Sequence, residues 1–403
     1  MTTRSKHTAR RIVIVGGGVS GLSIAVRLSQ SGLAVTVLEA GRLGQAASTK
    51  NQGWLYSGAW FAAQQPDLAR LCYESLQQTI KLCPECLEPA ALPMIYVMSS
   101  RKTKATHWTN AWNDAGIPYQ QIGTIVATQE TGIPESMVQH AYRLPDRAFR
   151  SDVLLECLTA KAEHQGVEVR TESSVTAFMR TGNRIDGVVT SHGEEIVARL
   201  VILAANVGGL PLWPDGAKPG EQAGFQRIGL KTHCLSVRPG LAEAPFCVVD
   251  AEGFNHIPHR PVSVFGSNRW VPVFDLADQH VIVPEVDRMW RLLSQFYPRF
   301  EREGHNIAEW SGVTVQAMHF DKTEPGLAPM PTVIDHEHQP PQASNLLSVF
   351  PGRASLWPQL AEATRLVVLE KLQDRIRKTA SPPWSLDSAG HHPTPTEDSN
   401  NLH

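Results

Sequence analysis

One stretch of the sequence, residues 11–41, constrains the fold of the chain more than any other. It reads RIVIVGGGVSGLSIAVRLSQSGLAVTVLEAG. The β-branched run from Ile12 to Val15 predicts a buried strand, and Ala34 to Leu38 predicts a second strand that ends at Glu39. Between them, apolar residues recur on one face of a helical pattern that Gly32 is expected to end. The order strand, glycine turn, helix, strand and acid predicts an α/β unit.

Three glycines in the turn indicate what this unit binds. Gly16, Gly18 and Gly21 form a G-x-G-x-x-G motif. In a dinucleotide-binding turn, the first glycine permits the tight bend, the second lets the backbone approach a pyrophosphate, and the third packs the helix against the strand. The helix N-terminus would attract phosphates, and Glu39 would accept hydrogen bonds from a ribose diol. We predict a dinucleotide site here, and the alternative is a glycine-rich turn without a ligand.

Composition narrows the class of protein. Of 403 residues, 42% are hydrophobic and 19% are charged, which suits a large core and two or three domains. The net charge of −2 argues against nucleic acid as a partner. Six cysteines in so long a chain do not indicate a disulfide framework. We therefore expect reduced, mostly buried thiols in a cytoplasmic protein.

The N-terminus imitates a signal peptide. Basic residues precede an uncharged run from Ile12 to Val26, but the predicted nucleotide-binding unit explains this run. No stretch reaches the roughly 18 apolar residues of a transmembrane helix. We expect a protein that is soluble and not exported.

Two features follow the first unit. Residues 41–61 form a small, polar, glycine-rich loop whose N–H groups could surround a ligand, with an ordinary surface loop as the alternative. Pro66 to Cys83 predicts a helix. Cys83 and Cys86 form C-x-x-C, which can be a redox pair or half of a zinc site. Because no second C-x-x-C or suitable His spacing accompanies it, we favour two incidental thiols and expect no metal.

A second βα unit is predicted near the middle of the chain. Ser151 is a suitable helix N-cap, and Val167 to Arg170 predicts the strand after that helix. Arg199 to Ala204 predicts another strand, which we expect to return to the nucleotide-binding sheet.

The pattern changes over residues 216–302. Short β-like runs separated by Pro and Gly predict an antiparallel sheet. These runs are His233 to Val237, Phe246 to Val249, Val262 to Phe265 and His280 to Val283. One helix is predicted from Pro284, and another follows the predicted strand Leu346 to Phe350.

Together these patterns predict an α/β fold with two domains. A Rossmann-type dinucleotide-binding domain is assembled from residues 10–65, 145–215 and 310–378. A second, α+β substrate domain is built on the antiparallel sheet from residues 66–144 and 216–309. Residues 381–403 are rich in Pro, Ser, Asp and His and are expected to be disordered.

Over most of Arg11 to Lys371 the chain resembles the D-amino acid oxidase-like superfamily of FAD-dependent oxidoreductases, which includes glycine oxidases, amino-acid dehydrogenases and glycerol-3-phosphate dehydrogenases. The resemblance is most specific in the glycine motif and the STKNQG loop. RSDVLLECLTAKAEHQGVEVRTESSV, RLVILAANVGG and NLLSVFPGRASLWPQLAEATRLV resemble further blocks of the superfamily. It implies FAD as the cofactor, and the lack of any cysteine beyond Cys247 implies that FAD is bound non-covalently.

The resemblance also implies which residues contact FAD. The glycine motif would hold the pyrophosphate, Glu39 the adenosine ribose, the Val175 backbone the adenine, and the turn at Gly352 the pyrimidine edge of the flavin. The implied cofactor-binding residues are Gly16, Gly18, Val19, Ser20, Gly21, Glu39, Ala40, Ser48, Asn51, Gln52, Gly53, Val175, Ala205, Gly352, Arg353 and Leu356.

The sequence departs from the superfamily at the substrate. WSGV, Trp310 to Val313, resembles a motif that usually leads to an Arg which clamps a substrate carboxylate, but Thr314 stands there. The loop Thr323 to Pro329 is reordered, and Tyr56 stands where the glycerol-phosphate and hydroxy-acid branch usually has His. Charged residues that could replace the missing Arg, if they are not simply at the surface, are Arg353, Arg269, His319 and Lys322.

The candidate catalytic residues are Arg353, His319 and Tyr56. An alcohol substrate would need a base such as His319 or His256, whereas a neutral amine would not. A structural role is the alternative for each His. Asp335 to His338 is interpreted as a solvent-exposed loop and not as a metal site.

We therefore expect an oxidase or dehydrogenase that transfers a hydride from a C–N bond of a small amino acid or amine to flavin N5. Oxidation of a 2-hydroxy acid or polyol phosphate is the alternative, and a non-catalytic flavin-binding protein is a further one. The expected electron acceptor is oxygen or a quinone. A disulfide reductase is disfavoured because no second G-x-G-x-x-G follows. Arg353 is expected to stabilise the reduced flavin.

Overall fold

The computed structural model describes residues 11–89, 92–212, 225–273, 275, 278–319, 330–338 and 342–380. The chain up to Arg365 packs as one compact unit, and the chain from Leu366 onward forms a second unit. The two sheets and the cavity discussed below all belong to the first unit.

A mostly parallel sheet of six strands carries the glycine turn, in the order β19-β20-β12-β1-β2-β8. Its strands are β1 Ile12–Val15, β2 Val35–Leu38, β8 Glu168–Arg170, β12 Leu200–Leu203, β19 Thr332–Asp335 and β20 Leu346–Phe350. The four residues of β1 are buried, as the β-branched run predicted. β1 pairs in parallel with β12, with Ile12 opposite Leu200, so the predicted return of the chain to this sheet is confirmed. The predicted α/β fold class is confirmed as well.

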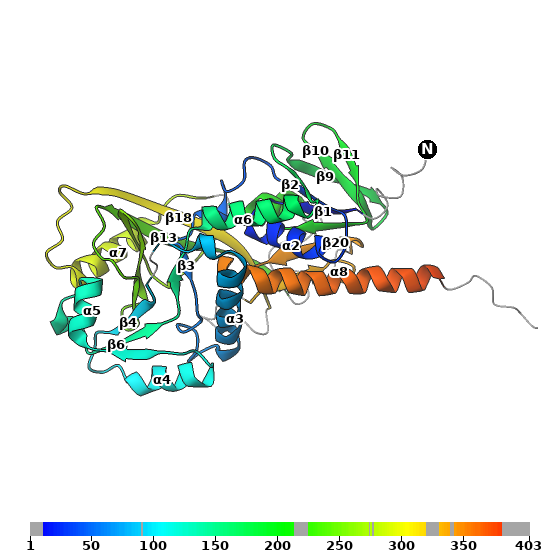
Figure 1. Cartoon of the computed structure of the whole chain (residues 1–403). Coiled ribbons are helices and arrows are strands. Elements are labelled where there is room, and N and C mark those ends of the chain that lie inside the picture. The colour runs from blue at the N-terminus through cyan, green and yellow to red at the C-terminus, as the bar shows by residue number, and fades with distance from the viewer. Residues whose placement is uncertain are drawn as a thin grey trace, which may run out of the picture. The chain divides into compact units, whose positions relative to one another are not determined.

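Two helices pack together on this sheet. α2 spans Val19–Ser29 and α6 spans Ser151–His164, and they lie side by side near β1 and β2 (Figure 1). The predicted N-cap of α6 is displaced by one residue. Ser151 is the first helical residue, and Arg150 caps the helix without a side-chain hydrogen bond.

A second sheet supplies the opposite wall of the cavity. Its order is β17-β13-β16-β15-β14-β4-β6-β5, and β18 pairs with β13 along its length. The strands are β4 Met94–Met98, β5 Gln120–Ile122, β6 His140–Leu144, β13 Phe225–Arg238, β14 Phe246–Val248, β15 Phe254–His259, β16 Val262–Gly266, β17 Val271–Val273 and β18 Asn306–His319. Three of the four β-like runs predicted in this region are strands here.

The fourth run, His280 to Val283, is not a strand, so that prediction is wrong. The His280 N–H donates to the Asp278 carboxylate, and the Ile282 N–H donates to His233 Nε2 at 3.0 Å. These side chains take up the amides that a ladder would need. α7 then begins at Val283, one residue before the proline that predicted its start.

Smaller elements complete the first unit, and the last helix, α8, continues past Arg365 into the second. The helices are α3 Pro66–Leu82, α4 Ala105–Asp114, α5 Thr124–Thr131 and α7 Val283–Phe296, and α8 runs Trp357–Ala380. β3 Trp54–Leu55 pairs with β7 Arg147–Ala148, and β9 Val175–Thr181, β10 Arg184–Thr190 and β11 Glu195–Val197 form a three-stranded sheet. Short 3₁₀ turns include η1 Ala47–Thr49, η2 Pro84–Cys86, η4 Asn206–Leu212 and η6 Ala354–Leu356.

The expectation that all cysteines are reduced is wrong. Cys83 and Cys157 form a disulfide that joins the end of α3 to α6. Cys83 therefore pairs across 74 residues and not with Cys86, its neighbour in the C-x-x-C. The other four cysteines are free and buried, as expected.

The interpretation of Asp335 to His338 as an exposed loop is also wrong in part. Asp335 ends β19, and His336 is buried, with its Nε2 hydrogen-bonded to Ser348 Oγ at 2.8 Å. The cause is pairing of β19 with β20, which draws the segment onto the sheet edge.

The domain boundaries and the disorder of the C-terminal tail stay predictions. The strands of the first sheet come from the segments assigned to the dinucleotide-binding domain, but the two-domain boundaries stay a prediction. The tail at 381–403 lies outside the described residues. Among the helices that the structure describes, none has the length and apolar character needed to cross a bilayer.

Candidate functional site

A cavity of about 390 Å³ lies where the glycine turn of the first sheet faces the second sheet. Gly16 sits at the end of β1 with φ +110°, a conformation that favours glycine, and its N–H donates to the Leu38 carbonyl at 2.8 Å. A Cβ on Gly16 would lie 2.8 Å from the backbone of Ala204, and one on Gly21 would lie 1.9 Å from the Gly16 carbonyl oxygen. Strand and helix therefore pack too closely at this turn for any side chain.

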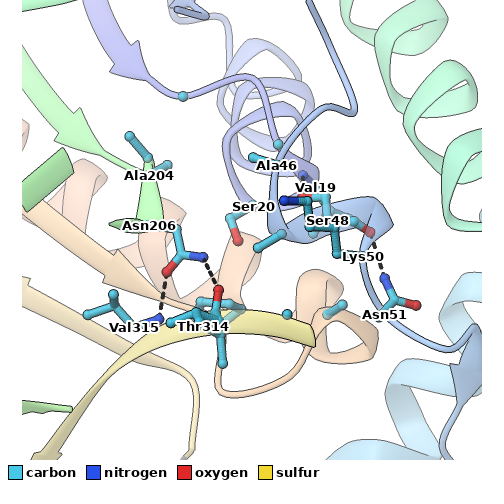
Figure 2. A pocket seen from close by; sticks show the side chains of 18 of the residues that line it. Val19, Ser20, Ala46, Ser48, Lys50, Asn51, Ala204, Asn206, Thr314 and Val315 are labelled. Carbon is cyan, nitrogen blue, oxygen red and sulfur yellow. Dashed lines mark hydrogen bonds between the residues drawn. The ribbon is translucent and has the colours of Figure 1, made fainter. Parts of the chain in front are cut away.

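The N-terminus of α2 points at the cavity. Gly18 caps the helix without a side-chain hydrogen bond, and the first turn contains no acidic residue. The Val19 N–H is taken by Ser48 Oγ at 3.1 Å, and Gly18, Val19 and Ser20 line the cavity (Figure 2). This arrangement leaves a positive dipole end facing the space where a phosphate would lie.

Glu39 lies at the end of β2 beside the same turn. Its carboxylate accepts hydrogen bonds from the Gly17 N–H at 2.7 Å and from the Gly41 N–H at 3.1 Å. These bonds fix the orientation of the carboxylate on the cavity wall, which it lines together with Ala40. A carboxylate oxygen accepts more than one hydrogen bond, so a ribose diol can still bind there.

The loop after η1 holds its own shape. Asn51 Nδ2 donates to the Ser48 carbonyl at 2.6 Å (Figure 2). Asn51 Oδ1 accepts from the Gly53 N–H at 2.8 Å. Ser48, Asn51 and Gln52 line the cavity, and so does Lys50, which sequence reasoning missed. Gly53 instead faces the other way, where a Cβ would lie 2.5 Å from the His259 ring.

Arg353 lines the cavity, and its side chain is buried. The centre of its guanidinium lies 4.6 Å from the Tyr56 ring, 4.4 Å from the Phe61 ring and 4.4 Å from the Trp270 ring. No carboxylate of the described residues forms an ion pair with it, and its Nε has no hydrogen-bond partner. Aromatic faces stabilise a cation but satisfy none of its N–H groups. Arg353 therefore offers an uncompensated positive charge to the cavity.

Tyr56 is held as a neutral phenol beside this guanidinium. Burial, opposed by the positive charge of Arg353, raises the pKa of Tyr56 to about 12. Its hydroxyl lies 3.3 Å from Asn268 Oδ1, and its ring stacks on Trp54 at 4.1 Å. Trp54 Nε1 in turn donates to the buried Asp146 carboxylate at 2.8 Å. Tyr56 therefore lines the cavity, and its raised pKa favours the neutral phenol at pH 7.

Of the two His candidates of the sequence, His256 does not line this cavity, and the side chain of His319 lies outside the described residues. His256 is fully buried between Ala244 and Ser263, and burial lowers its pKa to about 3. β18 ends at His319, whose side chain lies outside the described residues, as do Lys322 and the loop Thr323 to Pro329. Arg269 is exposed and pairs with Glu285 at 2.9 Å.

Most of the other predicted cofactor residues lie on the cavity wall. Val175, Ala205 and Gly352 line it, and Thr314 lines it at the position where the resemblance expects an Arg. Leu356 does not, because it is buried in the aromatic core next to Tyr56.

Sequence reasoning missed several residues of the wall. These are Lys50, His233, Trp270 and Ser355. His233 is buried, burial lowers its pKa, and its Nε2 accepts from the Ile282 N–H. The one sequence signal for His233 was its position on the predicted strand His233 to Val237.

The residues present fit FAD. A Cβ on Gly18 would lie 2.8 Å from Ser48 Oγ, so glycine leaves the backbone at the start of α2 bare where it lines the cavity. Ser355 also lines the cavity, and its Oγ is buried without a hydrogen-bond partner among the described residues. A buried polar atom without a partner is uncommon unless a ligand supplies one. The α2 N-terminus, Glu39 and the loop from Ser48 to Gln52 would hold the dinucleotide, and the Gly352–Ser355 turn would face the flavin.

Comparison with known proteins agrees with this site. Residues 11–339 match the family described as FAD dependent oxidoreductase, DAO. The chain therefore belongs to this family of enzymes, and FAD is its cofactor.

Two curated relatives illustrate the range of the family. One component of the anaerobic glycerol-3-phosphate dehydrogenase of Escherichia coli K12 is 27% identical over 218 residues, which are 52% of this chain and 39% of that protein. Glycine oxidase of Pseudomonas aeruginosa is 28% identical over 209 residues, which are 49% of this chain and 55% of that protein. The matched region thus spans less than two thirds of either relative.

Solved structures extend the likeness to the whole fold. Glycine oxidase from Bacillus cereus superposes with a TM-score of 0.69 at 18% identity, covering 89% of this chain and 97% of that one. L-alpha-Glycerophosphate oxidase from Mycoplasma pneumoniae, crystallised with FAD bound, superposes with a TM-score of 0.65 at 16% identity, covering 88% and 93%. At these identities the likeness establishes the fold.

Proposed function

We propose that the protein oxidises the C–N bond of a small amino acid or amine, and that Arg353 binds the substrate's carboxylate. The observation that carries this proposal is the buried guanidinium of Arg353, which faces the cavity without an anionic partner among the described residues. A guanidinium matches a carboxylate through two parallel hydrogen bonds. Bound FAD supplies the hydride acceptor of the reaction.

The lack of a free base on the described wall favours an amine over an alcohol. Among the described residues that line the cavity, Glu39 is the one carboxylate, and it is engaged by Gly17 and Gly41. Tyr56 stays protonated, and His233 uses Nε2 to accept a hydrogen bond. An alcohol must lose its hydroxyl proton to a base, whereas an amine that is already neutral need not.

Oxidation of a 2-hydroxy acid or polyol phosphate is the second candidate. A guanidinium binds phosphate as well as carboxylate, and one group of curated relatives is named for glycerol-3-phosphate. The acceptor, oxygen or a quinone, and the cytoplasmic location stay predictions. A non-catalytic flavin-binding protein is the remaining alternative.

One experiment separates these functions. Anaerobic bleaching of the visible flavin absorption would be followed with amino acids, amines, 2-hydroxy acids and polyol phosphates. We expect bleaching by an amino acid. Bleaching by hydroxy acids or polyol phosphates alone would establish the second candidate, and a flavin that no compound bleaches would support the non-catalytic alternative.

Arg353→Ala tests the role of the guanidinium with the best substrate of that panel. Loss of a charge-assisted contact of about 1.5–3 kcal/mol should lower kcat/KM by about 10- to 100-fold. The matched control is an amine of similar size without a carboxylate, whose kcat/KM should not change. An equal loss for both substrates would contradict carboxylate binding by Arg353.

A further inference from the structure

Gln316 joins the strand that carries Thr314 to the turn that carries Arg353. It lies on β18, and its side chain is 1% exposed. Gln316 Oε1 accepts a hydrogen bond from the Gly352 N–H at 3.0 Å, and Nε2 donates to the Gly352 carbonyl at 3.1 Å. The side-chain amide thus binds both backbone polar groups of one glycine, as a neighbouring strand would.

A second contact fixes the orientation of this amide. Gln316 Nε2 also donates to Thr314 Oγ1 at 2.9 Å, so both of its N–H groups and its oxygen are used. The backbone around Thr314 is itself held by Asn206, whose Oδ1 accepts from the Val315 N–H at 2.6 Å and whose Nδ2 donates to the Val313 carbonyl at 3.4 Å (Figure 2). Gln316 is therefore anchored to a rigid part of β18.

The turn that Gln316 binds presents Arg353 directly. Gly352 has φ +69°, a left-handed conformation that favours glycine. The Arg353 N–H donates to the Pro351 carbonyl at 2.7 Å, and the Arg353 carbonyl accepts from the Leu356 N–H at 3.0 Å. These local bonds shape the turn, but they do not fix its place relative to β18. The Gln316 bonds do, one residue before the guanidinium.

We propose that Gln316 is a positioning residue that sets the location of the Arg353 guanidinium for the substrate's anionic group. This inference rests on the proposed function, because it requires that Arg353 binds the substrate. Gln316 itself is assigned no contact with the substrate. It also gives Thr314 a role, since its hydroxyl orients the amide in place of binding the carboxylate. The residue that acts on the substrate is Arg353, and Gln316 acts through it.

Gln316→Met is the direct test, because Met is close to Gln in length and cannot make these hydrogen bonds. We expect KM for the anionic substrate to rise about 10-fold while kcat stays within about 2-fold, since a displaced guanidinium loses binding shared by ground and transition states. Flavin content should match the wild type. The Kd of acetate, titrated against the flavin absorption spectrum, should rise by a similar factor.

Two further variants keep the test decisive. Thr314→Val removes the hydroxyl that orients the amide, keeps the shape of the side chain, and should raise KM by about 3-fold even if Gln316→Met does not fold. Ser348→Ala is the matched control. Ser348 lies on β20, and the substitution removes its buried hydrogen bond to His336, away from the Gly352 turn. Its KM should equal that of the wild type.

A double-mutant cycle decides between positioning and a general loss of structure. In an Arg353→Ala background, Gln316→Met should change KM by less than about 2-fold, because the group that it positions is absent. The same 10-fold change in both backgrounds, or unchanged KM in Gln316→Met, would overturn the inference while leaving the role of Arg353 intact. An Arg353→Ala enzyme with unchanged KM would instead overturn the proposed function and this inference with it.

Discussion

At the scale of single residues, the glycine turn separates two reasons for having no side chain. Gly21 is required by the fold, because its Cβ would meet the Gly16 carbonyl oxygen at 1.9 Å. Gly18 is different, since its Cβ would meet Ser48 Oγ at 2.8 Å, and a serine side chain can move. The fold can therefore accommodate a larger residue at Gly18, whereas the binding of a pyrophosphate cannot.

We predict that Gly18→Val yields a folded protein without FAD. The branched side chain would occupy the space through which the backbone approaches the pyrophosphate, and it would displace the Ser48 hydroxyl from the Val19 N–H. Flavin absorption of the purified protein measures loading, and circular dichroism checks the fold. Gly123→Ala is the control, because nothing lies within 4 Å of its added Cβ. Wild-type flavin content in Gly18→Val would contradict the assignment of this turn.

At the scale of elements, local patterns were readable from the sequence and long-range pairings were not. The β1–α2–β2 unit follows from a continuous run of residues, and so it was predicted almost to the residue. The aromatic box around Arg353 was not predicted, because it gathers Tyr56, Phe61 and Trp270 from segments about 200 residues apart. Periodicity carries no information about such meetings.

The disulfide between α3 and α6 is the clearest case. Cys83 stands three residues from Cys86, so the C-x-x-C spacing indicated the wrong partner. Cys157 lies in the middle of α6, where no sequence motif identifies it as a disulfide cysteine. Each helix was predicted separately, but nothing in either pattern indicates that the end of one meets the other. Chain topology decides this pairing.

We predict that protein purified without reductant and then denatured shows four titratable thiols, one for each free cysteine. Cys86→Ala should lower this count by one, whereas Cys157→Ala should raise it by one, because removing Cys157 frees the thiol of Cys83. Reduction should also lower the free energy of unfolding in urea, by up to about 4 kcal/mol for a loop of this size in the chain-entropy model. A count of six thiols in the unreduced wild type would contradict the disulfide.

At the scale of the whole molecule, the cavity exists because two sheets of different origin face each other. The first sheet supplies the glycine turn and Glu39, and β13 and β18 of the second supply His233 and Thr314. Sequence reasoning located the cofactor end, where a contiguous motif carries the chemistry. Of the wall that we propose for the substrate it predicted only Tyr56 and Arg353, since the rest of that wall comes from scattered single residues.

The last prediction concerns the pH dependence of stability and the contribution that His256 makes to it between pH 5 and 7. Burial lowers the pKa of His256 from 6.5 to about 3, although the Ala244 carbonyl favours the charged form. In the unfolded chain, His256 therefore binds a proton below pH 6.5. In the folded protein it stays neutral until about pH 3. The contribution of His256 to stability therefore rises with pH across this window and falls on acidification, by about 1.4 kcal/mol per pH unit below pH 6.5, or about 2 kcal/mol at pH 5.

His256→Asn isolates this contribution, because Asn can still donate to the Ala244 carbonyl and does not titrate. The variant should be less stable at pH 7, since the His256 ring packs 5.3 Å from Phe246 and 5.1 Å from Phe265. Between pH 7 and pH 5, however, it should lose about 2 kcal/mol less than the wild type in urea unfolding. The pKa of His259 is raised, because the hydrogen bonds to Glu88 and Gln52 outweigh the effect of burial. His259 therefore stabilises the folded protein as the pH falls through the same window, and it does so in both proteins. Parallel losses in the two proteins would show that His256 does not stay neutral on folding.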